Sequence, residues 1–228
     1  MSTAEQNLSI PSLSITILSD QASWLVPWLR ELTADWEQQG HRCRLVHQPD
    51  HIDKGDLCFI LSCGQLVQHE ILSRNDKNLV VHESCLPLGR GWSPLTWQIL
   101  EGENEIVATM FEAQNDVDAG PIYNQEKMVF EGHELIDELR GVQARATLKL
   151  CSDFVENYPN SAQDPRPQIG DATYYSKRTS ADSELDPNQT IANQFNLFRV
   201  ADNERYPLFF YHRGCKYILR IEKVSDRQ

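Results

Sequence analysis

A histidine and an aspartate stand where two apolar runs of the sequence end. His82 closes the apolar run 78–82, and Asp118 follows another run, 106–112, after a short loop. An imidazole can accept or donate a proton, and a neighbouring carboxylate can orient it and hold a bridging water. Because two strand ends of one sheet can bring such side chains together, we take His82 and Asp118 as the candidate reaction centre.

The residues around this pair allow a backbone to approach closely. Leu86-Pro87 ends the first run shortly after Ser84, and Gly89-Arg90-Gly91 places an arginine between two glycines. Asp118-Ala119-Gly120-Pro121 has the composition of a tight turn. A lone strand-end histidine is usually structural and a lone Asp-x-Gly usually marks a turn, so the prediction depends on their combination.

Alternating strand-like and helix-like patterns must position these residues. Short apolar runs predict strands, and apolar residues at helical spacing predict helices. The expected strands are 14–19, 43–47, 57–62, 78–82, 106–112 and 122–130, and the expected helices are 24–38, one from about residue 93, 133–157 and 189–198. Residues 158–171 predict a loop, and 208–211 with 216–221 predict a hairpin.

This order of elements predicts an α/β fold. We expect a Rossmann-like, mostly parallel sheet with helices on both faces, followed by a short C-terminal helix and a β-hairpin. A catalytic domain is expected over residues 1–157, with residues 158–228 completing the site. Ligands of such sheets bind beyond the carboxyl ends of the strands, where His82 and Asp118 fall.

Composition narrows the class of protein. The 228 residues are 40% hydrophobic and 24% charged, as in ordinary globular proteins, and the formal net charge of −12 disfavours general nucleic-acid binding. No apolar run is long enough for a membrane span, and the polar start over residues 1–11 does not resemble a signal peptide, so a cytoplasmic protein is expected. The cysteines form no C-x-x-C pair and no histidine cluster has zinc spacing, so no metal site is expected.

The stretch from His82 to Pro121 resembles the formyltransferases that use 10-formyltetrahydrofolate. His82-Glu83-Ser84-Cys85-Leu86-Pro87 is similar to their His-x-Ser-x-Leu-Pro motif, and Asp118-Ala119-Gly120-Pro121 to their Asp-x-Gly-Pro. Ser62-Cys63-Gly64-Gln65-Leu66 resembles the earlier loop of the family that lines the folate pocket. Positions in register between the two motifs are Gly91, Pro94, Trp97, Gly102 and Thr109.

The resemblance implies a reaction and its participants. A formyl group would pass from 10-formyltetrahydrofolate to an amine, with His82 and Asp118 at the reacting atoms and no metal. The donor-binding residues that it implies are Ser62, Cys63, Gly64, Leu66, Val117, Gly120 and Pro121.

One position departs from the family pattern. The family has an asparagine two residues before the histidine, where this chain has Val80. That asparagine donates a hydrogen bond to the reacting oxygen, and losing such a donor typically costs about 2.7–4 kcal/mol in the transition state. Ser84 is our first candidate for the replacement donor, and Asn115 is the second.

The acceptor is expected to be a nucleotide-linked amino sugar used for a surface glycan. Methionyl-tRNA formyltransferases resemble this chain less, because they carry a further C-terminal domain and basic surfaces. Glycinamide ribonucleotide formyltransferases have a glycine-rich loop where this chain reads Ser19-Asp20-Gln21-Ala22-Ser23. The expected acceptor-binding residues are Arg90, Gly91, Trp92, Arg199, Asn203, Arg205 and Tyr206.

Other functions remain open from the sequence. The acceptor could be another small amine such as glycinamide ribonucleotide, water could take the place of the amine in a formyl-folate hydrolase, or Val80 could mark a catalytically impaired binding homologue. A homodimer is compatible with the sequence.

Overall fold

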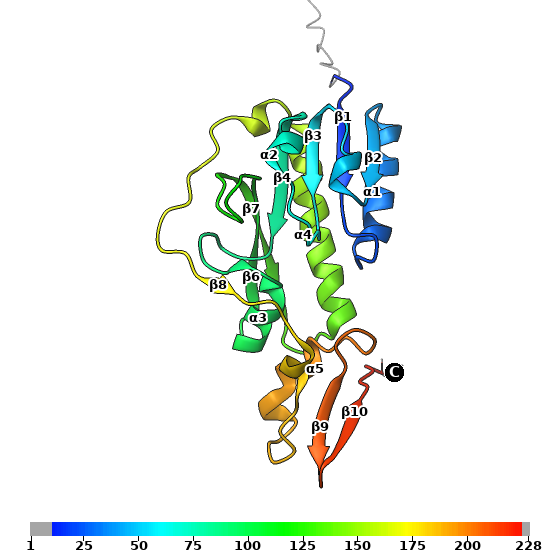
Figure 1. The fold of residues 1–228 in the computed structure, drawn as a ribbon, viewed down its shortest axis with the longest axis vertical. Helices are drawn as coiled ribbons and strands as arrows, with labels where there is room; N and C mark the ends of the chain where they lie inside the picture. Colours follow the sequence, from blue (N-terminus) through cyan, green and yellow to red (C-terminus); the bar gives the residue numbers. More distant parts are fainter. Residues whose placement is uncertain (1–10, 225–228) are drawn as a thin grey trace, which may run out of the picture. The chain divides into compact units, whose positions relative to one another are not determined.

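The computed structural model describes residues 11–224, so the polar N-terminal start lies almost wholly outside the described residues. A six-stranded sheet has the strand order β2-β1-β3-β4-β6-β7 (Figure 1). Its strands are β1 Ser14–Leu18, β2 Arg42–Val46, β3 Gly55–Ile60, β4 Asn75–His82, β6 Glu105–Glu112 and β7 Ile122–Val129. The mixed α/β class, the mostly parallel sheet and the C-terminal hairpin are therefore confirmed.

The remaining elements are short, apart from two helices. The helices are α1 Val26–Gln38, α2 His69–Leu72, α3 Pro94–Glu101, α4 Ile136–Glu156 and α5 Phe195–Arg199. The other strands are β5 Arg90–Gly91, β8 Tyr174–Tyr175, β9 Leu208–His212 and β10 Cys215–Leu219. Single 3-10 turns are η1 Pro49–His51, η2 Asn160–Ala162, η3 Ser180–Ser183 and η4 Ala192–Gln194. Within residues 11–224, no helix combines the length and apolar character needed to cross a bilayer.

The chain folds as two compact units. The first runs through Val80 and includes Cys151–Asp164, and the second comprises Val81–Leu150 and the chain from Pro165 onward. In the first unit β1 pairs in parallel with both β2 and β3, and β3 pairs in parallel with β4. The helix α1 buries Leu29, Leu32 and Trp36, and the Trp36 ring lies 5.4 Å from that of Phe59 in β3. The apolar stripe predicted for this helix is thus its buried face.

The second unit contains the antiparallel pair β6–β7 and the hairpin β9–β10. The β6–β7 register is interrupted between Met110 and Phe111, just before the turn that contains Asp118. Leu185, Phe198, Ala201 and Leu208 form a small hydrophobic core, against which Phe210 and Leu219 of the hairpin pack. The single helix expected over 189–198 is instead the 3-10 turn η4 followed by α5.

Candidate active site

His82 is a buried residue at the carboxyl end of β4. Its Nε2 lies 2.8 Å from the carbonyl oxygen of Gly89. Because a carbonyl oxygen can only accept, Nε2 carries a proton in this arrangement. A neutral His82 then has its lone pair on Nδ1, and this atom can take up a proton.

Asp118 lies in the turn between β6 and β7, with a φ of 54°. This left-handed region is uncommon for residues other than glycine, although aspartate enters it more often than most. Its Oδ2 accepts a 2.8 Å hydrogen bond from the backbone N–H of Gly91 and lies 3.9 Å from Nε2 of His82. The structure therefore brings together the two side chains that the sequence proposed as a pair.

Two glycines make this geometry sterically accessible. A Cβ atom at Gly120 would overlap the carbonyl oxygen of Glu112. Gly91 has a φ of 98°, and a Cβ atom there would lie 2.5 Å from the carbonyl oxygen of Tyr175. No other residue type fits either position without movement of the backbone.

Residues 165–177, here called the strap, lie along the segment that follows His82. The carbonyl oxygen of Thr173 accepts from the N–H of Arg90 at 2.9 Å, and that of Tyr175 accepts from the N–H of Trp92 at 3.1 Å. The Thr173 hydroxyl accepts from the N–H of Gly89 at 2.8 Å. The two backbone bonds form the short parallel pair β5–β8. Sequence reasoning assigned part of the strap to a loop in the segment expected to complete the acceptor site, but it named no strap residue as a contact.

Gln168 extends the strap to the Asp118 turn. Its Nε2 donates to the carbonyl oxygens of Asp118 and Gly120, at 2.8 and 2.9 Å. Its Oε1 accepts a 2.6 Å hydrogen bond from Nη2 of Arg90. No sequence signal distinguishes this glutamine from other polar loop residues, because its importance comes from contacts distant in the chain.

Arg90 and Trp92 present a cation and an aromatic ring next to this centre. The guanidinium of Arg90 is bonded to Gln168 and, at 3.4 Å, to the hydroxyl of Tyr174, and both partners are uncharged. The Trp92 side chain is 43% exposed, and Nζ of Lys177 lies 4.7 Å from its ring centroid. Lys177 and Tyr174 are candidate ligand contacts that the sequence did not single out.

Ser84 and Glu83 lie just beyond β4. The N–H of Ser84 donates to the carbonyl oxygen of His82, so the regular alternation of the strand stops at His82 and does not reach Ser84. The Ser84 hydroxyl is buried and has no hydrogen-bond partner among the described residues. The Glu83 carboxylate accepts a 2.7 Å bond from Gln143 of α4, and burial raises the pKa of this carboxyl above its ordinary value.

The loop expected to contact the donor lies in the first unit. Asp20 holds it: one carboxylate oxygen accepts from the N–H of Gly64 at 2.9 Å, and the other from Nε2 of Gln65 at 3.0 Å. Ser62 has a φ of 48° and receives a 2.8 Å bond from the Ser23 hydroxyl. Burial, together with the neighbouring Asp20, raises the pKa of the Cys63 thiol to about 11, so this thiol is protonated at neutral pH.

Comparison with known proteins decides the family. The family model described as formyl transferase matches residues 17–145, which is more than half of the chain and includes both His82 and Asp118. This chain belongs to the formyl transferase family. It is a formyltransferase enzyme.

Solved structures, two of them of formyltransferases, have the same fold. Methionyl-tRNA formyltransferase from Clostridium thermocellum matches with a TM-score of 0.75 and 18% identity, covering 95% of this chain and 96% of that one. A sugar N-formyltransferase from a Shewanella species matches with a TM-score of 0.70 and 14% identity, covering 93% and 99%. HypX from Aquifex aeolicus in complex with tetrahydrofolic acid matches with a TM-score of 0.74 and 17% identity, covering 90% of this chain and 36% of that one.

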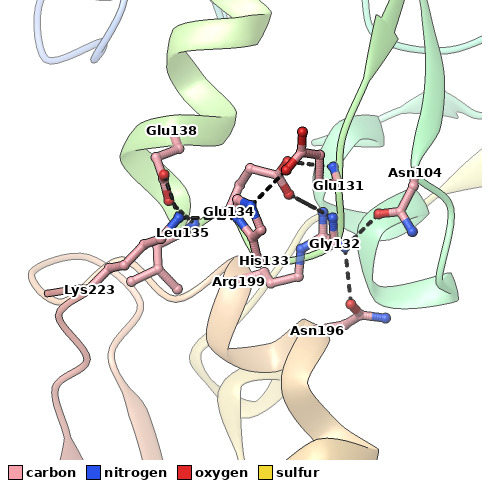
Figure 2. Close-up of polar contacts among 10 residues, drawn as sticks. All are labelled: Asn104, Glu131, Gly132, His133, Glu134, Leu135, Glu138, Asn196, Arg199 and Lys223. Carbon is pink, nitrogen blue, oxygen red and sulfur yellow. Dashed lines mark hydrogen bonds and ion pairs between the residues drawn. The ribbon is translucent and has the colours of Figure 1, made fainter. Parts of the chain in front are cut away.

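Arg199 was expected to contact the acceptor, but in this formyltransferase it bonds to other residues of the second unit (Figure 2). The guanidinium is buried, and it donates to Glu134 at 3.0 Å, to Asn104 at 2.9 Å and to Asn196 at 3.2 Å. A cation committed to three internal partners is not available to a ligand. The sequence could not reveal this, because two of the partners lie far away in the chain.

The remaining expected acceptor contacts differ in availability. Asn203 is tied to the backbone of Ile221 by two hydrogen bonds, which gives it a structural role. Tyr206 lies beneath the guanidinium of Arg178, 5.1 Å from ring centroid to Cζ. Arg205 is exposed and stays a candidate.

Two of the residues expected to contact the folate donor are apolar and exposed. Leu66 in the first unit is 80% exposed and Val117 in the second is 52% exposed, so both side chains are open to a ligand. Val80 is half-buried and offers no polar group, and Asn115 is exposed in the loop before Asp118. Among residues 11–224, no cluster of His, Cys, Asp or Glu has the arrangement of a metal site.

Proposed function

We propose that this formyltransferase moves the formyl group of 10-formyltetrahydrofolate to the amine of a nucleotide-linked amino sugar used for a surface glycan. The observation that carries the proposal is the adjacency of two features. The His82–Asp118 pair can handle the proton of an attacking amine, and the Arg90–Trp92 segment next to it offers a cation and an exposed ring. A nucleoside diphosphate has the complementary groups, because its phosphates pair with cations and its base stacks on aromatic rings.

In this proposal the donor supplies an activated formyl carbon when it is bound. His82 receives the proton that leaves the amine nitrogen as the new C–N bond forms, and it returns a proton to the nitrogen of the donor as the old C–N bond breaks. Asp118 holds the imidazole beside the reacting atoms and stabilises its protonated form. The Gly91 N–H in turn fixes the Asp118 carboxylate, so the carboxylate does not swing away.

The negative charge of the protein supports a small acceptor over tRNA. A net charge of −12 disfavours binding to a polynucleotide backbone, which proteins neutralise with many Lys and Arg side chains. Arg90 and Lys177 supply local positive charge on the scale of a diphosphate. A cytoplasmic location stays a prediction from the sequence.

The proposal is tested by incubating the protein and 10-formyltetrahydrofolate with UDP- and dTDP-linked amino sugars, glycinamide ribonucleotide and methionyl-tRNA. Mass spectrometry should detect the gain of one CO unit on a nucleotide sugar. Formylation of only the ribonucleotide or the tRNA would contradict the acceptor class. Formate release without any amine would instead indicate a hydrolase.

His82→Ala and Asp118→Asn test the reaction centre. Each variant should lower kcat by roughly 10²- to 10⁴-fold, the usual contribution of a positioned acid–base group. His133→Ala is the matched control, because His133 and Glu131 form a histidine–carboxylate pair at 2.9 Å on the surface of the same unit. Full activity of His82→Ala would refute the centre.

A further inference from the structure

We propose that Gln168 is a positioning residue for formyl transfer: it holds the Asp118 turn in its active geometry and orients Arg90 with the same amide group. The inference rests on the role proposed for Asp118 above. Gln168 lies in the strap, beyond the residues that match the family model.

The first step of the argument is the hydrogen bonding of the Gln168 amide. Its NH₂ group donates to two carbonyl oxygens of one turn, those of Asp118 and Gly120, and its oxygen faces a guanidinium. The alternative amide orientation would place the NH₂ group against the Arg90 cation and the oxygen against two acceptors. The chemistry of the partners thus fixes the orientation of the amide.

The second step is what the turn needs. Asp118 is a non-glycine residue at positive φ, a conformation that its surroundings must stabilise. The N–H of Gly91 holds the Asp118 carboxylate, and Gln168 holds the carbonyl oxygens on either side of Ala119. Side chain and backbone of the turn are therefore anchored separately.

The third step links the turn to Arg90. Since Oε1 of Gln168 accepts from Nη2 of Arg90, a shift of the amide moves both groups. An acceptor phosphate that pairs with Arg90 and shifts its guanidinium would thus also shift the Asp118 turn, through the single side chain of Gln168. Misplacement of a catalytic group by about 1 Å can cost up to about 100-fold in rate.

The test compares Gln168→Met and Gln168→Glu. Methionine keeps the length of the side chain but makes neither set of bonds. Glutamate keeps an oxygen for Arg90 and loses both donors to the turn. If Gln168 positions Asp118, kcat falls by roughly 10- to 100-fold in both variants while the KM for the donor changes little. If Gln168 only anchored Arg90, Gln168→Glu would retain the wild-type kcat, and this result would overturn the proposal.

Gln194→Met is the matched control. The Gln194 amide also donates to two carbonyl oxygens, those of Asp186 and Gln189, and accepts from a backbone N–H, but it lies in the 3-10 turn η4. It should leave kcat unchanged. Thermal unfolding of all variants reports whether any loss reflects global destabilisation.

Hydrogen exchange of the 116–121 peptide provides a readout that needs no substrate. Exchange should be faster in Gln168→Met than in the wild-type protein and in Gln194→Met. Unchanged exchange and kcat in Gln168→Met would overturn the inference while leaving the proposed function intact. A wild-type protein that transfers formyl to no acceptor would overturn the proposed function on its own, and exchange would still decide whether Gln168 anchors the turn.

Discussion

Backbone groups of two glycines hold the side chains of the reaction centre. The carbonyl oxygen of Gly89 accepts from His82, and the N–H of Gly91 donates to Asp118. Because both partners are main-chain groups, no long side chain has to be immobilised to make these two bonds. The two glycines around Arg90 therefore orient the proposed catalytic pair directly, in addition to permitting a close approach.

Gly120→Ala should disable the turn. The new methyl group would overlap the carbonyl oxygen of Glu112, so the β6–β7 turn must open and Asp118 must move. We expect a large loss of kcat and a lower melting temperature. Gly102→Ala is the control: Gly102 has a φ of 98° but nothing lies within 4 Å of its added Cβ atom, so only backbone strain of about 1–2 kcal/mol is introduced. Equal effects of the two substitutions on kcat would contradict this account.

The sequence could predict residues whose identity is dictated locally. His82, Asp118 and Gly120 were found because a motif fixes their types and their order. Arg199 and Asn203 were assigned to the acceptor because charged and amide groups in a loop usually face solvent, yet each has internal partners. Contacts between distant segments decide such cases, and a single sequence does not contain them.

At the scale of elements, a buried ion pair joins the β7–α4 turn to α5. Glu134 accepts from the N–H groups of Glu131 and Gly132 and from Arg199 of α5 (Figure 2). Burial alone would raise the pKa of Glu134, but these donors and the Arg199 charge outweigh it and lower the pKa to about 2. The charged form of Glu134 is therefore the one that stabilises the fold.

Glu134→Gln should reduce the loss of unfolding free energy that the protein shows at acid pH. The pKa of Glu134 is lower in the folded protein than in the unfolded chain, so its charged form adds stability at pH values above the unfolded pKa of 4.5. This contribution disappears as pH falls from 4.5 towards about 2. Such a shift corresponds to roughly 3 kcal/mol of unfolding free energy. Urea unfolding at several pH values should show a smaller decline over this range in Glu134→Gln, which should also be less stable at pH 7 because Arg199 loses its partner.

Glu105→Gln is the control for that measurement. Glu105 pairs with Lys127 on the surface, where both side chains are more than half exposed and an ion pair contributes little. The unfolding free energy of Glu105→Gln should change with pH as that of the wild-type protein does. A Glu134→Gln curve parallel to the wild-type curve would show that the pair does not contribute in this way.

The elements themselves were largely predictable. Apolar runs located β1 and β3, and helical spacing located α1 and α4, because burial dictates these patterns. The pair β5–β8 could not be predicted, since two-residue strands have no periodicity. The position of the strap is set by backbone bonds from Thr173 and Tyr175 to the distant segment 90–92. Nothing in the composition of the strap indicates this partner.

At the scale of the whole molecule, the fold alone does not identify the acceptor. The fold matches a methionyl-tRNA formyltransferase over nearly the whole of both chains, but also a sugar N-formyltransferase. Shape therefore does not separate the two acceptors. The net charge of −12 is the observation behind our prediction of a small acceptor, because a tRNA brings tens of phosphates to the surface that receives it.

The protein should not bind tRNA at physiological salt. Fluorescence anisotropy with labelled methionyl-tRNA should show no complex at about 10 µM protein, because no counterions are released by an acidic surface. A nucleotide-linked amino sugar should still be formylated in the same buffer. Tight, salt-sensitive tRNA binding would argue against the proposed acceptor class.

The attachment of the strap has a consequence for how this enzyme can diversify. Thr173 and Tyr175 hold Arg90 and Trp92 through main-chain atoms, which every amino acid except proline supplies alike. Side chains such as those of Tyr174 and Lys177 can therefore be exchanged without detaching the segment. New side chains in the strap can therefore be explored by mutation while His82 and Asp118, which lie outside it, are inherited unchanged.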